Sequence, residues 1–321
     1  MAQVVVVGSY VQDHAWLVDA FPRSGETRRA HGFNTGPGGK GFNQAVACAR
    51  QGVATAFVGA IGEDRLGAIA QEFARAENLP CRWQIRNDCP TAASSIVVNA
   101  HGENRIAVNF AANERLDPDF VRAQSDLFAD AKILLLQLEN NLDAIAAALE
   151  LGERHGLTRL LNPAPVVQDL QADLVRRAEI LTPNETEFAL LLERLADERI
   201  DPATLAGRGD AELHALARRL GVETVVITLG AQGGFVSHGD ARRGDDAAHY
   251  RLPTERVHTV DTTGAGDAFS GALAAAMVLF HNAPFRRAVA HANRAAALST
   301  ETVGTAPAMP TFAAVTERFG N

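Results

Sequence analysis

Val-Asp-Thr-Thr-Gly-Ala-Gly-Asp-Ala-Phe-Ser-Gly, residues 260–271, joins a polar turn to an alanine-rich run, 268–278, whose composition favours a helix. The first N–H groups of a helix have no intrahelical partner, and the helix dipole adds partial positive charge there. Gly264, Ala265 and Gly266 carry little or no side chain, so a phosphate can come close to those N–H groups. The stretch therefore predicts a turn that opens a helix and can hold an anion.

Asp267 falls in the first turn of this predicted helix. A carboxylate is a poor ligand for a phosphate, but it is well placed to take the proton of a hydroxyl group that attacks the phosphate. The alternative is a plain glycine turn in which Asp267 serves as the N-cap of the helix. This stretch alone does not decide between the two interpretations.

A second glycine-rich segment, Gly36-Pro37-Gly38-Gly39-Lys40-Gly41-Phe42-Asn43-Gln44, precedes the helical run 45–51. Its glycines satisfy G-x-G-x-x-G, but the segment does not follow the first strand and lacks a ribose-binding acid at the expected distance, which excludes a dinucleotide motif. A glycine follows Lys40, so the spacing also excludes a Walker A loop. Lys40 and Asn43 either bind a polyhydroxyl ligand or are a solvated lysine and a helix-surface residue.

Apolar runs that alternate with helical patterns predict a doubly wound, mostly parallel α/β sheet flanked by helices. Val4–Val7 is a β-branched run ended by Gly8, as in a strand that is buried on both faces. The predicted strands are 4–7, 55–60, 133–137, 158–161, 180–182 and 223–228. The predicted helices are 45–51, 64–77 with Asp64 as N-cap, 141–155, 265–280, 284–300 and a last one from about 311.

Polar residues follow the carboxyl ends of these strands, and this rim of an open α/β sheet is where ligands bind. They are Glu139, Asn162, Asn184, Glu187 and Thr228. Asp13 comes soon after the first strand and is expected at the same rim. Each of these residues alone is more often a cap or a turn residue, but together with the turn at Gly264 they predict a ligand site.

Two regions differ from the rest of the chain. Residues 10–36 alternate weakly and contain turn residues, and 91–98 and 105–110 have a hairpin pattern around the polar turn 99–104. Together, regions 10–36 and 91–112 predict a small β-sheet outside the main one. Since no repeat, low-complexity tract or linker separates the parts, we predict a single domain, residues 1–321, with this small sheet as a lid.

The composition, 47% hydrophobic and 21% charged, is typical of a soluble globular protein. The formal net charge is -8 and no basic run stands out, which argues against nucleic acid as a partner. Cys48, Cys81 and Cys89 lack metal-ligand spacing and suit a reducing compartment. The first residues, 1–8, contain no basic n-region and lead directly into a predicted strand, and no apolar run reaches the roughly 18 residues that a membrane span needs. We therefore expect a cytoplasmic protein.

Two of these segments resemble the signatures of the ribokinase family of sugar kinases, also called the PfkB family. Residues 38–45, Gly-Gly-Lys-Gly-Phe-Asn-Gln-Ala, resemble the first signature, and residues 261–269, Asp-Thr-Thr-Gly-Ala-Gly-Asp-Ala-Phe, resemble the second. Residues 181–187 are similar to the family's Asn-x-x-Glu segment, and 135–139, 161–165 and 227–230 resemble further family segments. The likeness runs from the first strand to the last loop.

The resemblance implies a central parallel sheet with a small β lid that often forms a homodimer. It implies ATP-dependent transfer of the γ-phosphoryl group to a primary hydroxyl of ribose or a similar sugar, with Mg²⁺ and a monovalent cation, usually potassium (K⁺), as cofactors. ATP and a small sugar are then the partners. The chemistry agrees with the residues, because phosphoryl transfer needs a positioned hydroxyl, a base and positive charge around the transferred group.

The resemblance also implies roles for individual residues. Asp267 matches the catalytic base, and Gly264, Ala265 and Gly266 match the anion hole. The sugar contacts match Asp13, Gly39, Lys40, Asn43 and Glu139. The nucleotide and Mg²⁺ region matches Asn184, Glu187, Thr228, Gly230, Gly233 and Asn293. The monovalent-cation site matches Asp261, Thr263, Ser299, Thr302, Gly304 and Ala308.

Two positions depart from the family pattern. Val11 stands where family members carry an asparagine, and valine cannot hydrogen-bond a sugar hydroxyl. Ala308 stands where a serine hydroxyl is expected near the cation. The acceptor therefore stays open between ribose, another sugar, a sugar phosphate and a nucleoside. A phosphorylated acceptor favours basic residues on the lid, with Arg28, Arg29 and Arg105 as candidates. A nucleoside favours an apolar slot, with Val11, Trp16 and Phe42 as candidates.

A third hypothesis belongs to another class, a sugar-binding or regulatory protein on a kinase fold without turnover. The complete Gly264–Asp267 segment argues against it.

Overall fold

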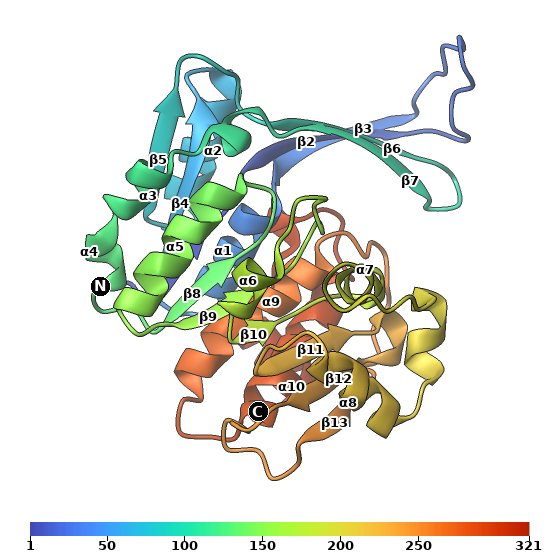
Figure 1. Cartoon of the computed structure of the whole chain (residues 1–321). Helices are drawn as coiled ribbons and strands as arrows, with labels where there is room; N and C mark the ends of the chain where they lie inside the picture. The colour runs from blue at the N-terminus through green and yellow to red at the C-terminus, as the bar shows by residue number, and fades with distance from the viewer. Residues whose placement is uncertain (321) are drawn as a thin grey trace.

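The computed structural model describes residues 1–320, and it contains one large and one small β-sheet together with the helices that cover the large one (Figure 1). The strands are β1 (Val4–Val7), β2 (Val11–Leu17), β3 (Gly32–Gly38), β4 (Thr55–Gly62), β5 (Cys81–Arg86), β6 (Ala93–Val98), β7 (Asn104–Asn109), β8 (Ile133–Leu136), β9 (Thr158–Leu161), β10 (Ile180–Leu181), β11 (Thr224–Thr228), β12 (Gly234–His238) and β13 (His249–Leu252). The α-helices are α1 (Lys40–Arg50), α2 (Arg65–Ala76), α3 (Pro118–Arg122), α4 (Ser125–Phe128), α5 (Leu142–Arg154), α6 (Ala172–Arg176), α7 (Glu185–Ala196), α8 (Asp210–Arg218), α9 (Ala265–Leu279), α10 (Phe285–Ser299) and α11 (Phe312–Phe319).

The large sheet has nine strands in the order β13-β12-β11-β10-β9-β8-β1-β4-β5. The seven strands β11-β10-β9-β8-β1-β4-β5 are parallel to one another. β12 pairs antiparallel with β11 on one side and with β13 on the other. β1 lies between β4 and β8, with Val4 opposite Thr55 on one side and Ile133 on the other. The predicted fold class, a mostly parallel sheet flanked by helices, is confirmed.

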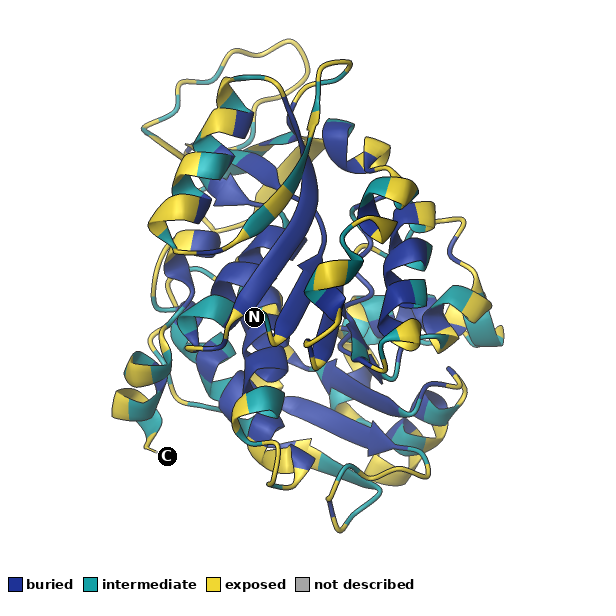
Figure 2. Cartoon of the chain, turned by 90° about the vertical axis from the view of Figure 1, so that its left-hand side faces the viewer, coloured by how far each residue is buried: buried dark blue, intermediate teal, exposed yellow. Residues whose placement is uncertain are grey.

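The alternation of side chains along β1 separates two hydrophobic cores. Val4 and Val6 pack with residues of α1, α9 and α10 on one face, and Val5 and Val7 pack with residues of α5, α7 and α8 on the other. Figure 2 shows the buried strands between helices whose outer faces are exposed. Both faces of the strand are therefore covered, which explains why Val4–Val7 is an unbroken apolar run.

The small sheet has the order β3-β2-β6-β7, with β2 and β6 parallel and the other pairs antiparallel. Its strands leave the body together as a long curved ribbon (Figure 1). All six residues of β7 are exposed, so this sheet has no core of its own. The predicted small sheet from residues 10–36 and 91–112 is confirmed.

The other predicted boundaries hold to within two residues, except that α1 begins at Lys40, five residues before the predicted start at 45. Asp64 is the N-cap of α2 and accepts the N–H of Gly67 at 2.8 Å, as predicted. Strands β5, β12 and β13 are not predicted by the sequence pattern. β5 and β13 are the two edge strands of the large sheet, and β12 pairs antiparallel between β11 and β13. Pairing with a neighbour decides the conformation of such strands more than an apolar run does. Within residues 1–320, no helix has the length and apolar character needed to cross a membrane.

Candidate active site

The turn at Gly264 opens helix α9, as the sequence predicts. Gly264 is the N-cap in the left-handed conformation (φ 79°), which a residue with a side chain rarely adopts. Asp267 is the third residue of the helix, and its side chain caps no N–H group of α9. The alternative in which Asp267 is the N-cap is therefore wrong.

The carboxylate of Asp267 is held by two adjacent amide side chains of α1. Asn43 Nδ2 donates to Asp267 Oδ2 at 2.9 Å, and Gln44 Nε2 donates to Asp267 Oδ1 at 2.9 Å. Asp267 is 6% exposed and Asn43 is 3% exposed, so neither is a helix-surface residue. Hydrogen bonds to both oxygens fix the plane of the carboxylate.

The amide groups next to Asp267 are not equivalent. The N–H of Ala265 donates to the carbonyl of Thr262 at 3.2 Å, whereas the N–H groups of Gly264 and Gly266 have no acceptor among the described residues. Gly266 is exposed, and a Cβ at this position would meet nothing within 4 Å. Gly264 and Gly266 are therefore free to bind an anion from outside the protein, and Ala265 is not.

Glu139 connects the end of β8 to the start of α1. Its Oε2 accepts the hydroxyl of Ser9 at 2.5 Å and the N–H of Lys40 at 2.8 Å. Gly39, the N-cap of α1, has φ 86°, and a Cβ there would lie 2.6 Å from the backbone nitrogen of Val11. Only glycine allows α1 to begin this close to the first strands of the lid.

Asp13 lies on β2 of the small sheet and accepts the hydroxyl of Ser94 on β6 at 2.5 Å. A Cβ on Gly38 would lie 2.0 Å from Asp13 Oδ2, so this glycine leaves the room that the carboxylate occupies. Burial raises the pKa of Asp13, and the nearby negative charge of Asp267 raises it further. The small sheet thus contributes a carboxylate to the same site as α9.

Lys40 sits among several carboxylates. Burial alone would lower its pKa, but Asp267, Glu139 and Glu187 together hold the pKa above its usual value, so the ammonium stays charged. The pKa of Glu139 is raised, because burial outweighs the opposing effects of Lys40 and Ser9. Burial likewise raises the pKa of Glu187, against its hydrogen bond to Asn184 and the charge of Lys40.

Glu139→Gln is expected to raise the melting temperature of the free protein at neutral pH. A raised carboxyl pKa means that the folded state binds the proton more tightly, so the ionised Glu139 destabilises the fold above that pKa. A glutamine oxygen can still accept the Ser9 and Lys40 donors. The gain in melting temperature should shrink as the pH falls through the raised pKa, where the wild-type group is neutral.

The measurement is differential scanning fluorimetry of both proteins from about pH 5 to about pH 8. The exposed Glu193→Gln, which removes a surface ion pair with Arg199, serves as control and should change little. A Glu139→Gln protein that melts at or below the wild-type temperature at neutral pH would contradict this account of the site.

The predicted nucleotide residues gather at the next strand ends. Asn184 caps α7 in a capping box with Glu187, in which Glu187 N donates to Asn184 Oδ1 at 2.8 Å and Asn184 N donates to Glu187 Oε2 at 2.9 Å. Asn184 also forms a parallel bridge with Thr228, at the end of β11. Gly230 and Gly233, both with positive φ, make the turn between β11 and β12. Asn293 lies apart on α10 and donates to the carbonyl of Pro253 at 2.9 Å.

The predicted monovalent-cation residues lie where the turn before α9 meets the 299–308 segment. Asp261 accepts the N–H of Thr263 at 2.9 Å and that of Gly304 at 3.0 Å, one at each carboxylate oxygen. The hydroxyl of Ser299 donates to Ala296 O, and the N–H of Thr302 donates to Ser299 O. Ala308 is buried in the short turn Ala306–Ala308. The structure brings Asp261 and Gly304 into contact and Thr302 next to Ser299.

A divalent metal site is not built by the protein alone. Among residues 1–320, no three or more His, Cys, Asp or Glu side chains are grouped so as to hold a metal ion. Mg²⁺ is commonly held by one or two carboxylates together with substrate phosphates, and Glu187 has one carboxylate oxygen without a partner in the described part of the chain. The residues present therefore fit a metal that arrives with a nucleotide.

Two of the alternative acceptors lose support. Phe42 is fully buried and packs edge-on against Tyr10 and Phe57, so it belongs to the core and lines no nucleoside slot. Arg28 is paired with Asp19 and Glu26, and the Arg105 guanidinium lies 4.2 Å above the ring of Phe21. Two of the three arginines proposed for a phosphorylated acceptor are thus already engaged.

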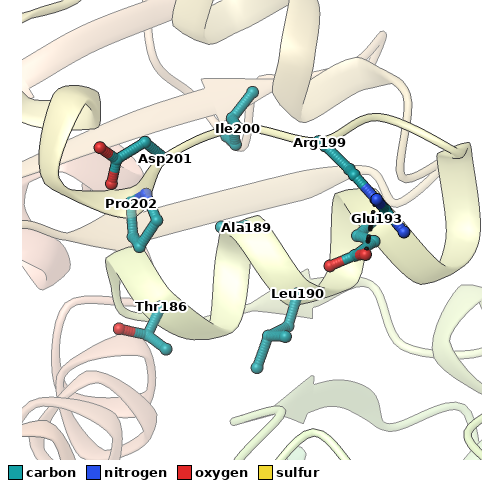
Figure 3. A pocket seen from close by; sticks show the side chains of 8 residues that line it. All are labelled: Thr186, Ala189, Leu190, Glu193, Arg199, Ile200, Asp201 and Pro202. Atoms are coloured by element: carbon teal, nitrogen blue, oxygen red, sulfur yellow. Dashed lines mark ion pairs between the residues drawn. The ribbon is translucent and has the colours of Figure 1, made fainter.

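A surface hollow of about 370 Å³ lies beside α7 and away from these residues (Figure 3). Its lining includes Leu190, Ile200 and the ion pair between Glu193 and Arg199, whose side chain is 85% exposed. None of the predicted site residues lines it. Thr186, which is adjacent in sequence to Glu187, is the lining residue nearest along the chain to the predicted site.

Comparison with known proteins decides the family. Residues 1–312 match the pfkB family carbohydrate kinase. The chain belongs to this family. It is 34% identical over 310 residues to the ribokinase of Mus musculus, covering 96% of this chain and 92% of that one. It is 31% identical over 283 residues to a deoxyribokinase of Salmonella typhi, covering 84% of each chain. The structure of Arabidopsis thaliana ribokinase complexed with ribose and ATP superposes with a TM-score of 0.80 at 28% identity, covering 99% of this chain and 98% of that chain.

In this pfkB-family chain, the predicted residues Glu139, Asn162, Asn184 and Thr228 lie at or just after the carboxyl ends of β8, β9, β10 and β11. Asp13 reaches the site from the small sheet, and Asn293 lies apart on α10. The sequence reasoning missed Ser9, Gln44 and Ser94, which hold Glu139, Asp267 and Asp13 respectively. Gln44 stands within the first signature, but no local pattern indicates that its partner is 223 residues away. Serines in strands and turns carry no distinguishing signal at all.

Proposed function

We propose that this protein is an ATP-dependent kinase that phosphorylates a primary hydroxyl of ribose. The observation that carries the proposal is the carboxylate of Asp267, held by Asn43 and Gln44 beside the free N–H groups of Gly264 and Gly266. Such an arrangement places a proton acceptor and an anion site at the start of one helix. The family membership supports the same chemistry.

In the proposed reaction the sugar hydroxyl oxygen attacks the γ-phosphorus of ATP. A new O–P bond forms, the bond between the γ-phosphorus and the bridging oxygen of the β-phosphate breaks, and ADP leaves. Asp267 accepts the hydroxyl proton as general base. The N–H groups of Gly264 and Gly266 stabilise the charge on the transferred group. The family resemblance assigns Ala265 to the same role, although the N–H of Ala265 donates to Thr262 O in the free protein.

Lys40 would supply positive charge near the phosphates, and Mg²⁺, when bound with the nucleotide, would supply further charge that offsets their negative charge. Glu187 would hold the metal through its free carboxylate oxygen. Asn184, Thr228, Gly230 and Gly233 would contact the nucleotide at the ends of β10 and β11, with Asn293 on α10. A potassium ion would be held near Asp261 by the carboxylate and by carbonyl oxygens of the 299–308 segment, since Ala308 offers no hydroxyl.

The sugar would bind between Asp13, Asn43 and Glu139, with Gly39 and Lys40 at the start of α1. A second acceptor is favoured by Val11, which is 3% exposed on the same strand as Asp13. A valine cannot hydrogen-bond a sugar hydroxyl. A sugar that lacks this hydroxyl therefore loses no hydrogen bond here, and the site discriminates against it less. 2-Deoxyribose is therefore the second candidate, in line with the deoxyribokinase relative.

The test is ADP release measured with a panel of pentoses, 2-deoxyribose, hexoses and nucleosides, each with and without potassium. We expect the highest kcat/KM with ribose, and a preference over 2-deoxyribose of at most about tenfold, because the hydroxyl-binding side chain is missing. Activity should rise with potassium and require Mg²⁺. The absence of turnover with every sugar would refute the proposal.

We further propose that residues 1–321 act as one kinase domain with the small sheet as lid, because this sheet supplies Asp13 and Ser94 to the site. Trp16, Phe33, Ile106 and Val108 are exposed on this sheet, which supports a homodimer formed through the lid. The three free cysteines support a cytoplasmic location. Light scattering of the purified protein measures the oligomeric state.

A further inference from the structure

Gln44 is a fully buried residue of α1 whose polar atoms all bind within the protein. Its Nε2 donates to Asp267 Oδ1 at 2.9 Å and to Asn162 Oδ1 at 3.0 Å, and its Oε1 accepts Gln137 Nε2 at 2.6 Å. The two N–H bonds of the amide are thus both used. Gln44 has no donor left for a substrate.

The orientation of this amide is dictated by a chain that begins at a backbone carbonyl. The carbonyl of Thr182 can only accept, so the Nδ2 of Asn162, 2.9 Å away, must face it. The oxygen of Asn162 then faces Gln44 and requires the NH₂ group of Gln44 on that side. The same NH₂ group therefore points at Asp267, and the carbonyl oxygen of Gln44 faces Gln137.

These hydrogen bonds connect three strand ends to the helix that carries Asp267. Gln137 follows β8, Asn162 follows β9, and Thr182 follows β10, so each group stands on the rigid rim of the large sheet. Helices α1 and α9 also approach closely, because a Cβ on Gly271 would lie 2.4 Å from the carbonyl oxygen of Gln44. The position of Gln44 relative to α9 is accordingly fixed.

A comparison with α7 shows what this chain prevents. Glu187 is the third residue of α7, and its carboxylate turns back to accept the N–H of the N-cap Asn184 at 2.9 Å. A glutamate or glutamine at this position commonly does so. Asp267 is the third residue of α9, yet its side chain binds no N–H group of its own helix. Gln44 and Asn43 hold it in another direction instead.

The two amides that hold Asp267 differ in one respect. Asn43 has a buried side-chain oxygen without a partner in the described part of the chain, so it retains hydrogen-bonding capacity for a ligand. Gln44 retains none. We propose that Gln44 is a positioning residue, which transmits the orientation of the sheet to Asp267 and keeps this carboxylate from capping α9. The inference rests on the proposed role of Asp267 as base.

The test is Gln44→Met, which keeps the length of the side chain and removes its donors and its acceptor. We expect kcat to fall by roughly thirty- to a hundredfold, because a base displaced by about 1 Å is far less effective. The KM values for the sugar and for ATP should stay within about threefold, since Gln44 touches neither. A raised KM together with an unchanged kcat would overturn the proposal.

Gln51→Met is the matched control. Gln51 is also a buried glutamine of the α1 region, and it too makes hydrogen bonds at both ends, to Pro310 O at 2.8 Å and to His291 Nε2 at 2.7 Å. Its replacement should lower the melting temperature about as much as Gln44→Met does, and leave kcat within about twofold. Equal loss of kcat in both variants would reduce the effect of Gln44 to stability.

A double mutant separates positioning from direct catalysis. In the Asp267→Asn background, Gln44→Met should lower kcat by no more than about twofold, because its effect passes through the carboxylate. A full additional thirtyfold loss would overturn the inference. If Gln44→Met does not fold, Asn162→Leu, which removes the oxygen that orients the NH₂ group of Gln44, is measured in the same way, and a kcat equal to wild type then rejects the proposed orientation of Asp267 by these hydrogen bonds.

These outcomes are distinct from failure of the proposed function. A wild-type protein that phosphorylates no sugar rejects the function, whereas an active wild type with an equally active, folded Gln44→Met protein rejects only the role of Gln44.

Discussion

Asp267→Asn is expected to lower kcat by about a thousandfold or more, which corresponds to roughly 4 kcal/mol of transition-state stabilisation. The reason is that an amide cannot accept the proton of the attacking hydroxyl, while the rest of the site is unchanged. The fold should tolerate the substitution. Asn43 has a free side-chain oxygen, so its amide can flip and accept a hydrogen bond from the new NH₂ group.

The measurement is kcat with the best sugar of the panel, together with the melting temperature and the affinity for ATP. The melting temperature and the affinity for ATP should stay near the wild-type values. Asp117→Asn, which changes an exposed acid that caps α3, is the control and should keep its activity. An Asp267→Asn enzyme with turnover near that of the wild type would remove Asp267 from the role of base and with it the mechanism proposed above.

Much of the fold follows from local sequence, and the exceptions have a common cause. The run Val4–Val7 predicts an interior strand because burial on both faces leaves no place for a polar residue. Strand β5 shows the opposite case, since Cys81–Arg86 mixes charged and apolar residues and pairs only with β4 at an edge. β12 begins at Gly234 directly after the turn from β11, and its direction depends on that turn. Both the edge strand β5 and the antiparallel strand β12 thus owe their conformation to a neighbouring strand rather than to their own pattern.

The candidate site divides in the same way. Residues of the two glycine-rich segments are predictable, because a helix start that leaves room for an anion requires glycines at particular places. Gln44 and Asn162 are not, since their function appears only when α1, α9 and the strand ends are folded together. The interpretation of Asp267 as N-cap fails for a related reason: local sequence does not reveal the long-range donors that occupy its oxygens.

Lys40→Met is expected to lower kcat by about a hundredfold and to move the acid limb of the activity profile to higher pH. The protein has only two lysines, Lys40 and Lys132, and the rest of its 30 lysine and arginine side chains are arginines. A compact ammonium on a flexible stem suits a crowded site better than a planar guanidinium. Without Lys40, the negative charges of Glu139, Glu187 and Asp267, which act on this ammonium in the free protein, would no longer be offset by it when the phosphates bind.

The direction of the pH shift follows from the electrostatics. Lys40 lowers the pKa of both Glu139 and Glu187, although burial keeps each pKa above its usual value. Removing the ammonium raises both pKa values further, so these groups are protonated at a higher pH and the acid limb moves upward. The exposed Lys132→Met is the control, and its profile should match that of the wild type. A Lys40→Met enzyme with an unshifted acid limb and kcat within about threefold of the wild type would show that this ammonium neither screens the carboxylates nor stabilises the transferred phosphoryl group.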